Sequence, residues 1–256
     1  MTPRQLASRA RAALRKAADA RVKERQRSYF KPWEKVSVYG VAMPEVSGIE
    51  RGLYQLVRTE WRYADAVAFC DLLIHDRYIE SKSLGLMLLA RYHRHYPEAL
   101  LRHVKRWLAN NFCDNWAVTD QLSTQIVSIV IDKFPKLAET VESWSNSPNL
   151  WLRRASAVTF VKPAGKGRYL EHAYRIATVL LPDAHDLIHK ACGWLLREAG
   201  KSDAARLERY LLEHRSAIPR TTVRYAIERF PESKRRRILQ KTRSAEAKSG
   251  STVWKG

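Results

Sequence analysis

A tryptophan and an aspartate lie one helical turn apart in the segment NNFCDNWAVTD. Trp116 and Asp120 are separated by four residues, so on a helix they share one face. A carboxylate beside an aromatic ring, in a strongly basic chain, could stabilise a developing positive charge. The spacing also fits an alternative in which Asp114 or Asp120 caps the following helix and Trp116 belongs to the core. Both interpretations stay open on spacing alone.

A second segment places two arginines early in a predicted helix. In PNLWLRRA, Trp151 and Ala155 mark a buried face, so that either Arg153 or Arg154 should project outward. An arginine there could bind a phosphate through two parallel hydrogen bonds, or it could simply be solvated.

A third segment combines a tryptophan with a lysine and an arginine. Lys190, Trp194 and Arg197 follow i, i+4, i+7 spacing and share one helical face. Such a face favours DNA contact, although a core tryptophan flanked by extended basic side chains would give the same pattern. Gly193 indicates that a neighbouring helix or a ligand approaches closely.

The charge of the chain is its most unusual property. The formal net charge is +20, with 46 basic and 26 acidic residues, and the excess is concentrated at residues 1–31 and 231–256. Such an excess attracts polyanions through counterion release, which makes nucleic acid the expected partner. An anionic membrane surface, an acidic protein and a merely soluble surface are the alternatives.

Several classes of protein find no support in the sequence. No GxGxxG, phosphate-binding lysine loop or GxSxG motif occurs, and His185 and His189 lack the glutamate of an HExxH site, so we expect no metal and no cofactor. The three cysteines, Cys70, Cys113 and Cys192, form no CxxC pair and are expected to be buried free thiols in a reducing cytoplasm. No apolar stretch is long enough for a membrane span. We therefore expect a cytoplasmic protein.

Helix-forming patterns dominate the chain, and prolines and glycines separate them. The first pattern runs through the basic segment 1–31. The one candidate strand, KVSVYGVAM, leads into Met43-Pro44 and is interpreted as a loop. Further helices are predicted over residues 61–75, 82–96, 98–110, 119–133, 136–145, 151–160, 169–181, 185–199, 203–214 and 219–230.

The predicted helices come in pairs, and the second helix of each pair recurs every 35 residues. Its starts lie near Ser81, Trp116, Trp151, Asp186 and Thr221. This period predicts an all-α fold, an α-solenoid of stacked HEAT-like antiparallel helix pairs with a basic concave face. We expect one repeat domain over residues 1–238, which includes the basic N-terminal helical segment 1–31, and a basic disordered tail over residues 239–256.

Four blocks of residues resemble, in order and spacing, the AlkD-type alkylpurine DNA glycosylases, which are HEAT-like repeat enzymes of DNA alkylation repair. The blocks are Ser28-Tyr29-Phe30-Lys31 with Tyr39-Gly40-Val41 and Pro44-Glu45, then Trp116 with Asp120, then Asn149-Leu150-Trp151-Leu152 with Arg154-Ala155, and finally Lys190-Ala191, Gly193-Trp194 and Leu196-Arg197-Glu198. Asn115, Thr119 and Cys192 depart from the family pattern.

The resemblance implies hydrolysis of the N-glycosidic bond of cationic N3- and N7-alkylated purines in duplex DNA, without base flipping. It implies a monomer in which Trp116 and Trp194 flank the deoxyribose and Asp120 is the catalytic carboxylate. Tyr29 would lie beside the damaged nucleotide. Phosphates would be bound by Arg154, Lys162, Lys190 and Arg197.

Two alternatives to a glycosylase remain on the sequence. One is a non-catalytic HEAT-like scaffold that binds DNA or RNA, and the other is a solenoid that binds an acidic protein. An aspartate on a phosphate-facing surface repels DNA, so its presence favours chemistry over simple binding. This inference requires that Asp120 neither caps a helix nor points into the helix stack.

Overall fold

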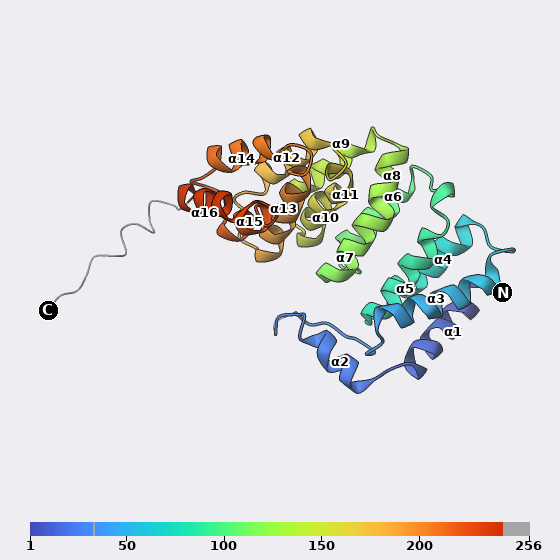
Figure 1. Cartoon of the computed structure of the whole chain (residues 1–256). Coiled ribbons are helices and arrows are strands. Elements are labelled where there is room, and N and C mark those ends of the chain that lie inside the picture. The colour runs from blue at the N-terminus through green and yellow to red at the C-terminus, as the bar shows by residue number, and fades with distance from the viewer. Residues whose placement is uncertain (33, 243–256) are drawn as a thin grey trace. The chain divides into compact units, whose positions relative to one another are not determined.

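The computed structural model describes residues 1–32 and 34–242, and within these ranges the regular structure is helical (Figure 1). Between these limits no strand forms, and an isolated parallel bridge joins Ser37 to Tyr78. The all-α prediction is confirmed, as is the loop predicted for residues 35–43, which forms no strand. Proline and glycine end the helical patterns much as the sequence predicts, because neither continues a helix.

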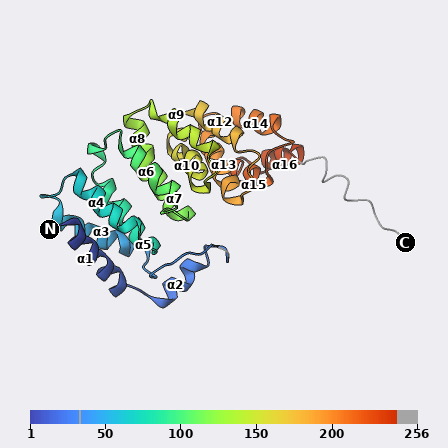
Figure 2. The same cartoon turned by 180° about the vertical axis from the view of Figure 1, so that it is seen from behind.

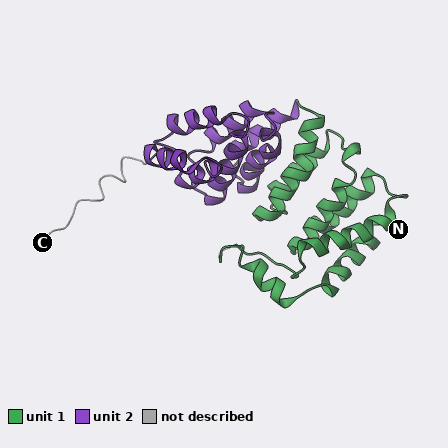
Figure 3. Ribbon diagram, viewed as in Figure 1, with its two compact units in different colours: residues 1–135 green, residues 136–256 purple. Residues whose placement is uncertain are grey.

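The chain divides into two compact units, residues 1–135 and residues 136–256 (Figure 3). The repeat domain predicted over residues 1–238 spans the first unit and the second unit as far as residue 238. Helix α16 extends to Lys241, so the predicted tail begins within a helix, while residues 243–256 of that tail lie outside the described residues.

The first unit is built around helix α5, which is buried along nearly its whole length and packs against α1, α3, α4 and α7. A π-helical turn, Ser123–Val127, separates α7 from α8, and a 3₁₀ turn, His93–His95, follows α5. The helices are α1 (Pro3–Lys16), α2 (Ala20–Arg27), α3 (Met43–Val57), α4 (Tyr63–Ile74), α5 (Ile79–Ala90), α6 (Leu100–Ala109), α7 (Trp116–Leu122) and α8 (Ser128–Lys133).

The basic N-terminal segment is two helices rather than one. It breaks before Ala20 because the Asp19 side chain accepts a hydrogen bond from the backbone N–H of Val22 at 2.9 Å and so caps α2. Helix α2 buries none of its side chains, and both views show it outside the stacked helices of its unit (Figures 1 and 2). Its position must therefore depend on polar contacts.

The sequence pattern does not predict helix α3. Its buried face consists of Val46, Glu50, Leu53 and Val57, so a carboxylate interrupts the apolar stripe. Glu50 is 3% exposed, and both of its oxygens accept hydrogen bonds from Arg91, at 3.0 and 2.7 Å. The buried carboxylate of an ion pair thus takes a position that the periodicity reserves for an apolar residue.

In the second unit, helix α13 packs against both α10 and α15. A 3₁₀ turn, Ser143–Asn146, follows the first helix of the unit. The helices are α9 (Leu137–Glu142), α10 (Leu150–Thr159), α11 (Val161–Ala164), α12 (Leu170–Val179), α13 (Asp186–Ala199), α14 (Ala204–Glu213), α15 (Arg220–Ala226) and α16 (Glu232–Lys241).

The predicted 35-residue spacing of the second helices agrees closely with the structure. Helices α5, α7, α10, α13 and α15 each begin within two residues of the predicted start. Within each unit the helices stack on one another, α4 against α5 in the first and α13 against α10 and α15 in the second, as in a helical solenoid.

A row of ion pairs links the alternate helices of the second unit. Glu142 of α9 binds Arg175 of α12 at 2.7 Å, and Glu171 of α12 binds Arg206 of α14 at 2.6 Å. Glu208 of α14 then binds both Lys234 and Arg237 of α16, at 2.9 and 2.6 Å. Each helix of this row is therefore joined to the next by a carboxylate and a cation.

The three cysteines are free and buried, as the sequence predicts. Burial raises the pKa of the Cys113 thiol to about 12 and that of the Cys192 thiol to about 12. Thiols with such values stay protonated near neutral pH, so they behave as small core residues.

Candidate functional site

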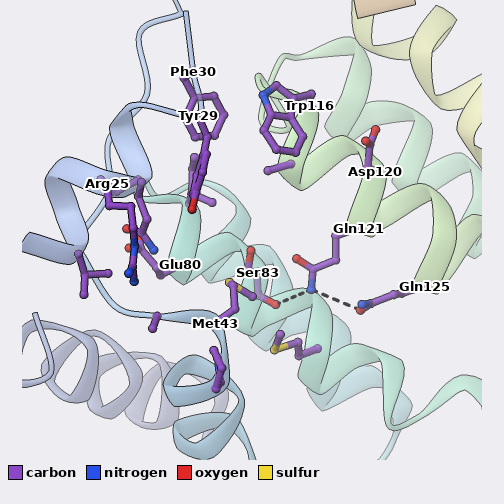
Figure 4. A pocket seen from close by; sticks show the side chains of 18 residues that line it. Arg25, Tyr29, Phe30, Met43, Glu80, Ser83, Trp116, Asp120, Gln121 and Gln125 are labelled. Carbon is purple, nitrogen blue, oxygen red and sulfur yellow. Dashed lines mark hydrogen bonds between the residues drawn. The ribbon is translucent and has the colours of Figure 1, made fainter. Parts of the chain in front are cut away.

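A pocket of about 560 Å³ lies in the first unit between α2, the loop that follows it, α5 and α7 (Figure 4). It brings together three of the residues that the sequence proposed as functional, namely Tyr29, Trp116 and Asp120. Its other lining residues are Val22, Arg25, Gln26, Phe30, Val38, Ala42, Met43, Pro44, Ile79, Glu80, Ser83, Met87, Ala117, Gln121 and Gln125.

The start of α7 determines where Asp120 can act. Asn115, which is 2% exposed, caps the helix by accepting a hydrogen bond from the Val118 backbone N–H at 3.0 Å. Asp114 instead forms an ion pair with the buried Lys82 at 2.9 Å. The alternative in which Asp114 or Asp120 caps this helix is therefore wrong, and Asp120 is half-buried on the pocket wall.

Aromatic side chains form the wall of the pocket beside Asp120. The ring centroids of Phe30 and Trp116 are 5.2 Å apart and the two planes are tilted by 31°. Trp116 is half-buried and Tyr29 is 63% exposed, so the tyrosine ring is open to a ligand. The wall thus joins a ring from the segment after α2 to a ring from α7.

Two hydroxyl groups form hydrogen bonds to backbone carbonyls around Asp120. Ser123 donates to the carbonyl of Thr119 at 2.7 Å, and Thr124 donates to the carbonyl of Asp120 at 2.8 Å. These bonds coincide with the π-helical turn Ser123–Val127, a feature often found at functional sites. Gln121 and Gln125 are four residues apart, and both line the pocket.

Glu80 holds the loop that closes one side of the pocket. Its carboxylate, on a residue that is 1% exposed, accepts hydrogen bonds from the backbone N–H groups of Tyr39, Gly40 and Val41 at 3.0, 2.9 and 3.2 Å. The Gln26 amide donates to the Val41 carbonyl at 2.8 Å, which ties α2 to the same loop. Sequence reasoning missed Glu80, since a buried carboxylate has no signature in an apolar run.

The second unit contains the other proposed tryptophan, Trp194, which is half-buried on α13. Lys190, one turn earlier, forms an ion pair with Asp186 at 2.7 Å, and Arg197, one turn later, forms ion pairs with Glu198 and Glu228. Although partial burial raises it, the hydrogen bond from Lys190 lowers the pKa of Asp186 below its usual value. Both cations of this face are therefore already partnered by carboxylates.

The close approach indicated by Gly193 is made by helix α15. A Cβ atom at this position would lie 2.4 Å from the Cβ atom of Tyr225 and 2.9 Å from the carbonyl oxygen of Thr222. The glycine thus serves helix packing within the second unit.

Neither arginine of α10 projects outward as the sequence pattern predicts. Arg154 is 5% exposed and donates to the carbonyl of Leu187 at the start of α13. Arg153 is half-buried and binds Asp183 at 2.6 Å. Lys162, on the short helix α11, is exposed. A phosphate contact from Arg154 stays a prediction. The guanidinium group that would make this contact is buried.

Among residues 1–32 and 34–242, no group of three or more histidine, cysteine, aspartate or glutamate side chains could hold a metal ion. None of the helices in these ranges is both long enough and apolar enough to cross a membrane.

Comparison with known proteins identifies the family of the chain and a solved structure with a similar fold. Residues 10–230 match the family model described as DNA alkylation repair enzyme. A solved structure described as a predicted DNA alkylation repair enzyme from Enterococcus faecalis superposes with a TM-score of 0.72. It is 14% identical in sequence, and the match covers 84% of this chain and 97% of that one, so it establishes the similarity of the fold. No match was found among curated proteins.

Proposed function

Because the chain belongs to the DNA alkylation repair enzyme family, we propose that it is a DNA glycosylase that hydrolyses the N-glycosidic bond of N3- and N7-alkylated purines in duplex DNA. Its substrate is double-stranded DNA that contains alkylated purines, and it acts as a monomer without flipping the damaged base. Asp120 is the catalytic carboxylate, and Trp116 and Trp194 flank the deoxyribose.

The chemistry that we propose needs little acid catalysis. An alkylated purine carries a positive charge, so the electron pair of the C1′–N9 or equivalent glycosidic bond neutralises the base as it departs. The sugar that remains has oxocarbenium character, which the Asp120 carboxylate stabilises electrostatically. Water then adds to C1′ and loses a proton. The electron-rich face of Trp116 adds a cation–π attraction to the same charge.

The observation that carries this proposal is the position of Asp120 on an aromatic pocket wall. Asn115 supplies the helix cap, so Asp120 is not required for that structural role. The chain has a net charge of +20, and a half-buried aspartate beside Trp116 and Phe30 would weaken simple binding to phosphates. A carboxylate at this position can stabilise the positive charge that develops on the sugar during the reaction.

The phosphates of the duplex are bound by basic side chains of the second unit. Lys162, Lys190, Arg197 and Arg154 are the proposed contacts, and Tyr29 of the first unit lies against the damaged nucleotide. Lys162 and Tyr29 are exposed, which supports these roles. The ion pairs of Lys190 and Arg197 would have to exchange a carboxylate for a phosphate on binding.

The test is release of 3-methyladenine and 7-methylguanine from methylated duplex DNA under single-turnover conditions. We expect release by the wild type and a rate at least ~100-fold lower for Asp120→Asn, the size of effect that loss of one transition-state electrostatic contact produces. DNA affinity should be retained or increased in this variant, because a negative charge is removed.

The matched control is Asp132→Asn, which changes an exposed aspartate of α8 that does not line the pocket. It should release both bases at the wild-type rate. Equal rates for Asp120→Asn and the wild type would remove Asp120 from the chemistry. Tight, salt-sensitive DNA binding with no release by the wild type would instead indicate a non-catalytic DNA-binding protein.

A further inference from the structure

The charge of the pocket in the first unit differs from that of the chain as a whole. Arg25 is the one cation among its lining residues, whereas Glu80 and Asp120 are carboxylates. The chain has a net charge of +20. A ligand that carries a phosphate would therefore find less favourable electrostatics here than elsewhere on the protein, and a neutral ligand would meet no such penalty.

The walls of the pocket suit a flat, mostly apolar molecule. Val22, Val38, Met43, Ile79 and Met87 supply aliphatic and thioether surface, and Phe30 and Trp116 supply aromatic faces. A nucleobase can stack on such an aromatic face, and this stacking favours binding. A volume of about 560 Å³ lies within the ordinary range for small-molecule sites and is ample for one purine ring system.

One buried acceptor in the wall lacks a hydrogen-bond partner. The Nε2 atom of Gln26 donates to the carbonyl of Val41 at 2.8 Å, which fixes the orientation of the amide. Its Oε1 atom is buried without a donor. Leaving a buried acceptor unsatisfied is unfavourable, and an N–H group of a ligand that reached it would recover part of that cost.

A second amide pair is oriented toward the same space. Gln121 donates through Nε2 to the carbonyl of Ser83 at 3.1 Å and to Oε1 of Gln125 at 3.3 Å. These acceptors fix both amides, and Oε1 of Gln121 then points toward the space between the walls (Figure 4). The edge of a purine carries donors and acceptors, which amide groups can bind in pairs.

We propose that this pocket binds a free N-methylated purine, the base released by the reaction. When the glycosidic bond breaks, its electron pair stays with the base and cancels the positive charge of the alkylated ring, so the product is a neutral planar purine. The apolar walls, the low cationic content and the three amide side chains fit that molecule. Its identity as the product rests on the proposed glycosylase function.

The experiment measures binding of free 7-methylguanine and 3-methyladenine to the whole protein by equilibrium dialysis, without DNA. We expect saturable binding of one molecule of either base by the wild type. 7-Methylguanosine 5′-monophosphate, which adds a ribose and a phosphate to the same base, should bind about tenfold more weakly or worse, because its phosphate meets the two carboxylates.

Gln121→Leu should weaken binding of the free base by about tenfold, the effect of losing one hydrogen bond. The matched control is Gln55→Leu, a glutamine of α3 that is exposed and does not line the pocket, and it should bind as the wild type does. Gln125→Leu is the second pocket variant and carries the comparison if Gln121→Leu does not fold. Added free base should also slow turnover of the wild type through product inhibition.

This inference would be overturned if the folded wild type bound neither free base. It would also be overturned if the wild type and the folded pocket variants bound the free base equally. Tighter binding of the nucleotide than of the free base would do the same. Base release from DNA is measured separately, so the two proposals can fail independently. A protein that releases bases from DNA but does not bind them afterwards keeps its function and loses this site.

Discussion

The Glu80 carboxylate accepts a hydrogen bond from the backbone N–H of Gly40 at 2.9 Å, and this contact joins the core helix α5 to a loop 40 residues away in the chain. The same loop binds α2 through Gln26 and through the backbone N–H of Asp19, which donates to the Gly40 carbonyl at 3.0 Å. Because α2 buries no side chain, these polar contacts position the pocket wall that includes Tyr29.

Glu80→Gln should lower the free energy of unfolding by about 2–3 kcal/mol, because an amide replaces a buried carboxylate that accepts three backbone N–H groups. Chemical denaturation would measure this loss. Hydrogen exchange should become faster at the amides of residues 39–41. Glu45→Gln, at an exposed position of α3, should stay within about 0.5 kcal/mol of the wild type. A similar stability for both variants would contradict the role of Glu80.

Gly40→Ala tests the other member of this contact. Gly40 has a φ angle of 91°, and a Cβ atom there would lie 2.3 Å from the carbonyl oxygen of Asp19. We expect a loss of at least ~2 kcal/mol in the free energy of unfolding, since the backbone strain and the clash add. Gly52→Ala is the matched control, because a Cβ atom in that part of α3 meets nothing within 4 Å. It should stabilise the protein by about 0.5–1 kcal/mol.

Much of the fold could be predicted from the sequence, because helices dominate and proline and glycine mark their ends. The exceptions have physical causes. Helix α3 has Glu50 in its buried stripe, where it pairs with Arg91. The carboxylate interrupts the apolar periodicity, so the sequence pattern does not predict this helix. The break between α1 and α2 follows from the cap that the Asp19 side chain provides to α2. The two alanines before Asp19 favour a continuous helix, so the pattern of the sequence does not predict this break.

The candidate site was predictable only in part. The i, i+4 spacing of Trp116 and Asp120 placed both on one helical face, and both line the pocket. The structure was needed to show that Asn115 caps α7, because Asn115, Asp114 and Asp120 are all residues that can cap. Glu80 and Gln26 could not be found from spacing, since long-range contacts to backbone groups bring them to the pocket.

Lys162→Gln should weaken binding to duplex DNA of any sequence and reduce the salt dependence of the affinity by about one phosphate contact. The lysine is exposed on the second unit and is one of the proposed phosphate contacts. Fluorescence anisotropy at a series of salt concentrations would give both quantities. Lys105→Gln, which removes an exposed lysine of α6, is the matched control and should leave the slope unchanged. An unchanged slope for Lys162→Gln would exclude this lysine from the interface.

The row of ion pairs in the second unit makes its stability dependent on pH. The hydrogen bond from Arg175 lowers the pKa of Glu142, the hydrogen bond from Arg206 lowers that of Glu171, and the hydrogen bond from Lys234 lowers that of Glu208. A carboxyl group whose pKa is lower in the folded state stabilises the protein above its unfolded pKa, about 4.3 for glutamate. That contribution is lost as the pH falls through the lower, folded value.

Arg175→Met should therefore destabilise the protein at pH 7 more than at an acid pH below the folded pKa of Glu142, because protonation of Glu142 removes the same interaction that the substitution removes. Denaturation of both proteins across this range would measure the difference, and the curve of the variant should fall less steeply on acidification. Arg102→Met, at an exposed position of α6, should run parallel to the wild type at every pH. A constant difference between Arg175→Met and the wild type would mean that the arginine contributes through packing of its side chain and not through the charge of Glu142.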